Sequence, residues 1–114
     1  DDSFYAAGHV AVGIGDHDRA SFAEDQLSSR GRERRIEMLA SSFTQAPDLL
    51  IGTQRLTVMQ QRLARALAGR QAIAWQPMPF EFPVMREMIQ FHRARTADPG
   101  LAWLVACLHE VAQD

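Results

Sequence analysis

The sequence contains no lysine and only one cysteine, and these two absences bear on nucleic-acid binding and on disulfide formation. All 12 basic residues are arginine, and against 14 acidic residues they leave a net charge of −2 with the histidines neutral. Domains that grip nucleic-acid phosphates usually carry a basic surplus, so any DNA contacts are expected outside this sequence. Cys107 has no partner for an internal disulfide, which fits the reducing cytoplasm.

Long apolar runs are also missing. None approaches the roughly 20 residues of a membrane helix, and the opening Asp1-Asp2-Ser3 lacks the basic and apolar regions of a signal peptide. The composition is otherwise that of an ordinary globular domain, 46% hydrophobic and 23% charged. A length of 114 residues suits one small domain or one lobe of a larger one.

Short apolar runs alternate with helical patterns through the first two thirds of the chain. Strands are predicted at 8–15, 34–40, 56–59 and 71–75, and helices at 21–30, 44–51 and 60–68. Because parallel strands need a crossover helix between them, this order predicts an α/β fold with a parallel-type sheet and flanking helices.

Several residues mark the expected helix ends. Ser21 and Glu24 have the spacing of a capping box, in which each side chain bonds the other's backbone N–H. Gly31 suits the left-handed position after a helix, and Gly69 ends a later one. Pro47 fits only the first turn of its helix, where its missing N–H leaves no bond unmade.

Pro77, Pro79 and Pro83 mark a change to a linker or edge segment. Beyond it we expect a helical pair, 84–91 and a second helix capped by Asp98. The shared apolar stripe of this pair is Val84, Met88, Phe91, Leu101 and Leu104. From the residues alone, this stripe packs either on the first part of the chain or on an element absent from the sequence. Left uncovered, it predicts self-association.

No constellation of residues indicates catalysis, a metal or a cofactor. His9, Asp16, His17 and Asp18 show no metal-ligand spacing and are interpreted as ordinary polar residues. Gly13 and Gly15 follow a strand, but Asp18 stands where the dinucleotide fingerprint needs a third glycine. The chain is therefore not expected to be an enzyme.

Two loops, 15–21 and 41–44, are candidate ligand-binding loops. Each follows the carboxyl end of a predicted strand, where open α/β sheets bind ligands. Ser21 and Thr44 head the next helices, and Phe22 and Phe43 sit beside them. Hydroxyls with aromatic rings would suit a small aromatic acid. Alternatively, the hydroxyls only cap helices and the rings belong to the core.

Three passages together resemble the LysR-type regulators over nearly the whole chain, near the nodulation and salicylate types. The motifs are Ser42-Phe43-x-x-x-Pro47-x-Leu49-Leu50-x-Gly52-Thr53 with Leu56-Thr57-Val58-Met59-x-x-Arg62-Leu63-Ala64, then Pro77-Met78-Pro79-Phe80-Glu81-Phe82-Pro83, and Phe91-His92-x-x-x-x-x-Asp98-Pro99-x-x-x-Trp103-Leu104. Gln54 replaces the aspartate that often follows such a threonine, and Phe91 replaces a common tryptophan.

The resemblance implies the C-terminal part of a periplasmic-binding-protein-like effector domain. Residues 1–78 would form its second lobe. Residues 79–114 would be the hinge return and the helices that pack on the first lobe. The first lobe and a winged helix-turn-helix that binds DNA would precede Asp1. The resemblance therefore favours the second option for the apolar stripe, packing on an element absent from the sequence.

The family binds its inducer between the lobes, and the resemblance carries this role to Asp16, His17, Ser21, Phe22, Ser42, Phe43, Gln90 and Phe91. Ser42 stands where salicylate-type relatives often have histidine. The implied function is inducer sensing, possible ligands including an aromatic carboxylate, in a cytoplasmic homo-oligomer (dimer or tetramer) that contacts DNA through its absent domain. Two alternatives stay open: a ligand-free domain that dimerises through 21–30, or a small standalone α/β enzyme.

Overall fold

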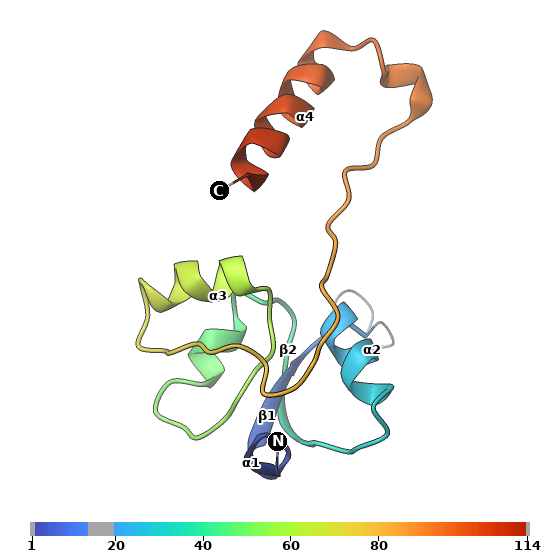
Figure 1. Ribbon diagram of the computed structural model, residues 1–114. Coiled ribbons are helices and arrows are strands. Elements are labelled where there is room, and N and C mark those ends of the chain that lie inside the picture. The colour runs from blue at the N-terminus through green and yellow to red at the C-terminus, as the bar shows by residue number, and fades with distance from the viewer. Residues whose placement is uncertain (1, 14–19, 114) are drawn as a thin grey trace.

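A pair of parallel strands lies at the centre of the N-terminal part of the chain, seen in the computed structural model of Figure 1, which describes residues 2–13 and 20–113. The elements run α1 (Asp2–Ala6), β1 (Gly8–Val12), α2 (Phe22–Ser28), β2 (Arg35–Ala40), the 3-10 turn η1 (Ala46–Leu49), α3 (Gln61–Ala68), a second 3-10 turn η2 (Arg93–Arg95) and α4 (Pro99–Ala112). We call residues 2–82 the body and residues 83–113 the tail. Helix α1 was not predicted.

Strand β1 is one of the two strands of the sheet. It pairs in parallel with β2, from Gly8 beside Arg35 to Val12 beside Ala40, with an irregularity after His9. All of β1 is buried, whereas β2 is exposed except for Ala40. The α/β class and the parallel pairing predicted from the sequence are therefore confirmed, in a sheet smaller than expected.

The predicted third strand, 56–59, is reduced to a single bridge between Leu56 and His9. Leu56 exchanges backbone hydrogen bonds with Gly8 and Val10, at 2.9 and 2.8 Å. The Thr57 hydroxyl then donates to the Val10 carbonyl at 2.9 Å. In a longer parallel ladder, the Val10 carbonyl would accept a hydrogen bond from the next backbone N–H of this strand. The Thr57 side chain occupies that carbonyl instead, so the pairing ends here.

The predicted fourth strand, 71–75, is wrong. The N–H of Ile73 donates to the carbonyl of Gln71 at 2.8 Å, a three-residue turn that takes this stretch out of extended geometry. Trp75 then lies under the guanidinium of Arg65 on α3, 4.8 Å from its ring centre. The stretch consequently follows α3 and adds nothing to the sheet.

The helix ends are mostly as predicted. Ser21 caps α2, and Gly31 and Gly52 take positive φ angles of 69° and 75°, although α2 ends at Ser28 and not at about residue 30. Two expectations fail. The helix predicted at 44–51 is only η1, because the chain between Pro47 and Gly52 is too short for more. Its N-cap is Gln45, with no side-chain capping bond, so Thr44 does not head it.

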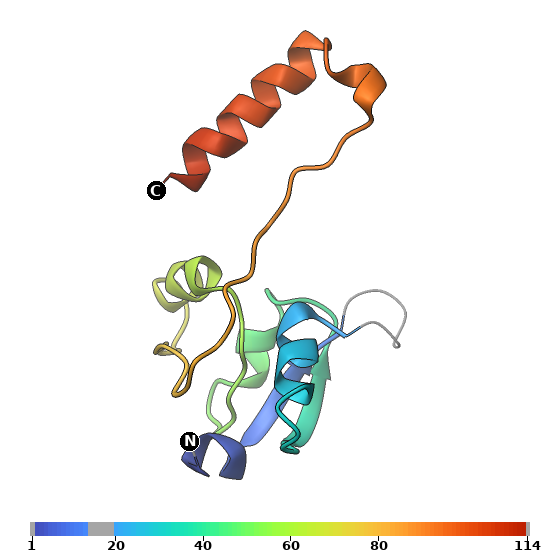
Figure 2. The ribbon, with the colours of Figure 1, turned by 45° about the vertical axis from the view of Figure 1, so that its right-hand side comes forward.

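The helix predicted at 84–91 is also wrong, because this stretch is extended between the body and η2 (Figure 2). An eight-residue helix is marginal without a surface to pack on, and Val84 and Met88 are 87% and 83% exposed. The following helix does form: Asp98 accepts from the Leu101 N–H at 3.1 Å and caps α4. Phe91 and Leu104 are exposed as well, whereas Leu101 is half-buried, so four of the five residues of the apolar stripe are exposed.

The core of the body is small. Its buried centre joins both strands to η1, with partly buried side chains packed around it: Val10, Val12, Ala40 and Ala46, then Phe43, Leu49, Leu50 and Met59. Within the described ranges, no helix combines the length and apolar character needed to cross a membrane.

Candidate functional site

The two candidate loops meet at one edge of the sheet. Gly13, directly after β1, donates to the Ala40 carbonyl at the end of β2 at 3.1 Å. Gly13 also forms an antiparallel bridge with Ala20, which returns the chain to the same place before α2 begins. The stretch beginning at Ser21 and the loop after Ala40 therefore start at the same carboxyl edge, as the sequence predicted.

Ser21 and Phe22 are held by α2. The Ser21 side chain is buried, 4% exposed, and its Oγ accepts from the Glu24 N–H at 3.3 Å. The Phe22 ring packs edge-on against Phe82 of the returning segment, with 6.5 Å between ring centres. Ser21 thus has the capping role named as the alternative above, and Phe22 belongs to an aromatic contact.

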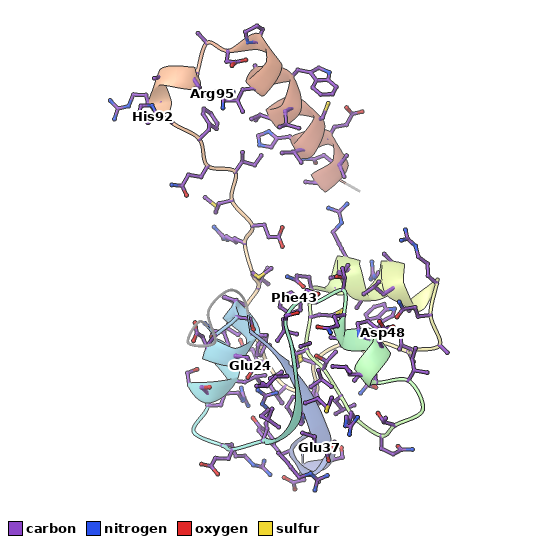
Figure 3. All side chains as sticks on the ribbon, turned by 180° about the vertical axis from the view of Figure 1, so that it is seen from behind. Glu24, Glu37, Phe43, Asp48, His92 and Arg95 are labelled. Atoms are coloured by element: carbon purple, nitrogen blue, oxygen red, sulfur yellow. The ribbon has the colours of Figure 1, made fainter. Side chains whose placement is uncertain are left out.

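The loop after β2 is tied by its own side chains. The Ser42 Oγ accepts from the Gln45 N–H and lies near the Thr44 hydroxyl, at 3.2 Å in both cases. The Gln45 side-chain oxygen accepts from both the backbone N–H and the hydroxyl of Ser41, at 3.0 Å each. Phe43 is half-buried against the core and lies at the end of the sheet away from Glu37 (Figure 3).

The remaining four candidates lie outside the described residues or away from this edge. Asp16 and His17 lie outside the described residues. Gln90 and Phe91 lie in the extended segment, just before His92, which Figure 3 shows far from Phe43. The structure gathers four of the eight candidates and leaves these two apart. Phe91 instead covers a hollow of about 330 Å³ beside α4, together with Thr96, Leu101, Ala102, Val105, Ala106 and His109.

A buried polar network behind the sheet was not predicted. His9 is completely buried, with Nε2 2.7 Å from the Phe4 carbonyl and Nδ1 3.3 Å from Nη1 of Arg34. Because a carbonyl only accepts, Nε2 carries the proton and Nδ1 accepts from Arg34. Arg34 also forms an ion pair with Glu24 of α2, which replaces the reciprocal half of the predicted capping box.

Electrostatics keep this histidine neutral. Burial away from water lowers the pKa of His9, the nearby Arg34 charge lowers it further, and the bond to Phe4 only partly opposes the change. One weak signal of this network is visible in the sequence, a histidine inside an otherwise apolar run. In the part of the chain that the structure describes, no three His, Cys, Asp or Glu side chains converge on a point that could hold a metal ion.

The chain is similar to nodulation protein D of several root-nodule bacteria. It is 32% identical to nodulation protein D 2 of Bradyrhizobium diazoefficiens over 111 residues, 97% of this chain and 34% of that protein. It is 32% identical to nodulation protein D 2 of Rhizobium tropici (89% of this chain, 32% of that protein) and 34% identical to nodulation protein D 1 of Sinorhizobium fredii (90% and 32%).

The chain spans about a third of the length of the curated relatives it matches. No protein-family model matches it, and no solved structure does. Nodulation protein D is a transcription regulator and not an enzyme. The chain therefore matches the effector-binding part of nodulation protein D, a LysR-type regulator.

Proposed function

We propose that this chain is the inducer-sensing part of a LysR-type transcription regulator. The observation that carries the proposal is the identity of about a third with nodulation protein D over nearly the whole chain. With a net charge of −2, the chain itself offers no general affinity for phosphates, so DNA binding belongs to another domain of a cytoplasmic homo-oligomer.

The proposed inducer site is the carboxyl edge of the sheet, facing a first lobe. Ser21, Phe22, Ser42 and Phe43 would contribute, together with Asp16 and His17 from the stretch that precedes Ser21 in the sequence. Gln90 and Phe91 would close the cleft once the extended segment docks on that lobe. The parallel strand pair supports this placement, because ligands of open α/β sheets gather at such edges.

The mechanism would be a shift between two lobe arrangements. An inducer that binds one arrangement more tightly raises its population and changes how the oligomer holds DNA. A ligand with equal affinity for both arrangements would change nothing. Hydroxyl groups beside aromatic rings suit an aromatic carboxylate as the inducer.

The experiment is a fluorescence titration of the complete regulator with a panel of aromatic carboxylates, following Trp75 and Trp103. A saturable change that is lost in Ser42→Ala and Phe22→Ala supports the proposed site. Ser28→Ala, an exposed position of α2, is the control and should titrate like the original protein. Titrations that are identical in all four proteins would place the ligand elsewhere.

One observation favours a ligand-free alternative. The hydroxyls of Ser21 and Ser42 already accept hydrogen bonds from Glu24 and Gln45, so they need no ligand. In that case the domain serves only to assemble the oligomer, through residues 21–30. Retained dimerisation after Ser42 and Phe43 are replaced by alanine, with no response to any carboxylate of the panel, would support this alternative over inducer sensing.

A further inference from the structure

The segment that returns from the body toward the tail is gripped by aromatic rings. Phe80 packs edge-on against Phe4 at 5.2 Å and stacks with Tyr5 at 6.0 Å, both on α1. Phe82 packs edge-on against Phe22, the first residue of α2, at 6.5 Å. Residues 80–82 therefore contact both helices, and Figure 1 shows the returning chain passing beside α2.

Arg30 closes this arrangement with three contacts from one guanidinium group. Its central carbon lies 3.9 Å from the centre of the Phe80 ring. Its Nη1 donates to the carbonyl of Glu81 at 3.3 Å, and its Nε donates to the Tyr5 hydroxyl at 3.2 Å. Arginine can make such contacts together because its planar group stacks on a ring while its edge donates hydrogen bonds.

These contacts attach the returning segment to α2 at both ends of the helix. Phe22 begins α2 and holds Phe82, whereas Arg30 follows the helix by two residues and holds Phe80. Two attachment points fix the direction of a segment as well as its position. A displacement of α2 must consequently carry residues 80–82 with it.

Few other polar contacts hold the tail. Among the described residues, one hydrogen bond joins the tail to the body, from Arg62 Nη2 to the Val111 carbonyl at 2.7 Å. The start of the tail is therefore held at residues 80–82, and its last helix is held by Arg62.

We propose that Arg30 is a positioning residue that clamps the returning segment to α2 and so transmits movements at Phe22 to the start of the tail. The clamp stands on the contacts above. Its role in signalling rests on the proposed function, because only then does a ligand act on Phe22. The clamp keeps residues 80–82 in place relative to α2. The start of the tail therefore moves whenever α2 moves at Phe22.

Chymotrypsin cleavage after Phe80 tests the clamp in the intact protein without any ligand. The protease must take the Phe80 ring into its own pocket, so the rate of this one cut follows the fraction of molecules in which the ring has left the cluster. We expect Arg30→Gln to raise the rate roughly three- to tenfold, the range for losing a cation–ring contact with its hydrogen bonds. Mass spectrometry identifies the cut between Phe80 and Glu81.

Arg32→Gln is the matched control. Arg32 lies over the Tyr5 ring at 4.2 Å and pairs with Asp2 at 2.9 Å, so it makes the same kinds of contact without touching residues 80–82. It should change the rate less than twofold, and Arg30→Lys, which keeps the charge, should restore part of the protection. Equal rates for Arg30→Gln and Arg32→Gln would refute the clamp.

Phe22→Leu tests the transmission. If Phe22 and Arg30 hold one segment, removing the Phe22 ring also raises cleavage after Phe80. No change in Phe22→Leu, beside an increase in Arg30→Gln, would sink the transmission to the site. Because no inducer is present, these outcomes are independent of the fluorescence titration, and a failed titration leaves them standing.

Discussion

Arg34 donates a hydrogen bond to Nδ1 of His9 across 3.3 Å, so a guanidinium and an imidazole share the interior of the body with the imidazole held neutral. The network joins three elements, since His9 lies on β1, Glu24 on α2, and Arg34 just before β2. It connects α2, which Ser21 caps, to the sheet. Its strength bears on both stability and signalling.

Removing the imidazole should be costly. We expect His9→Ala to lower the free energy of unfolding by about 3 kcal/mol, because it leaves a cavity and strips partners from the Phe4 carbonyl and Arg34. His109→Ala, on the exposed surface of α4, should change it by less than about 0.5 kcal/mol. Urea denaturation measures both, and similar losses in the two variants would contradict a structural role for His9.

Stability should also fall on mild acidification. Because the pKa of His9 is lowered in the folded protein, the unfolded chain binds the proton more readily as pH falls below 6.5. The contribution of neutral His9 is therefore complete above pH 6.5 and is lost as pH falls toward the lowered pKa. Urea denaturation at pH 7.5, 6.5 and 5.5 should show the decline, and His9→Gln should flatten it. An equal slope in both proteins would assign the effect to other groups.

Glu24→Gln should destabilise the protein more than an exposed counterpart does. The side chains of Arg34 and Glu24 are 6% and 19% exposed, and removing one charge of a buried pair costs about 3 kcal/mol because the other stays buried and unpaired. Glu37→Gln is the comparison. The bond from Arg55 lowers the pKa of Glu37, but the pair lies at the surface, where little stability depends on it. Thermal unfolding that ranks the two variants equally would refute the distinction.

Ser21→Ala separates capping from ligand binding. Loss of the bond to the Glu24 N–H should lower the free energy of unfolding by about 1 kcal/mol. Ser28→Ala, within the same helix, should be neutral or slightly stabilising because alanine favours the helix. If Ser21→Ala retains the affinity for a responding carboxylate, Ser21 is a cap only. A tenfold weaker affinity would make it a ligand contact as well.

The uncovered tail should make the chain self-associate. Val84, Met88 and Trp103 are 87%, 83% and 69% exposed, more apolar surface than isolated domains usually leave in water. Light scattering should give an apparent mass that rises with protein concentration. Met88→Lys should reduce the rise, whereas Gln90→Lys, with the same added charge in the same segment, should reduce it less. A constant monomer mass would overturn this expectation.

The elements that local chemistry determines could be predicted from the sequence. Ser21 and Asp98 cap helices because their side chains reach the next turn, and Gly31 takes a backbone angle that other residues avoid. The meeting of two loops at one sheet edge also followed, because parallel strands end at the same edge. These inferences need only neighbouring residues and a simple topology rule.

The failures depended on distant partners. Residues 84–91 have the spacing of an amphipathic helix, but no described surface covers Val84 and Met88, and an isolated short helix gains too little. Trp75 lies outside the sheet, and its ring instead contacts the guanidinium of Arg65. The clamp by Arg30 was invisible for the same reason, since 50 residues separate it from Phe80 and no spacing rule connects them.

The extended stretch 84–91 determines the effective concentration of α4 near any surface of the same polypeptide that could cover it. Eight extended residues reach about 28 Å at most, and a short tether of this kind holds its cargo at an effective concentration on the order of millimolar. At ordinary protein concentrations, α4 therefore binds a covering surface within that reach on the same polypeptide in preference to an identical surface on another molecule. Exchange of α4 between copies is then favoured only where the tether is too short to span the gap.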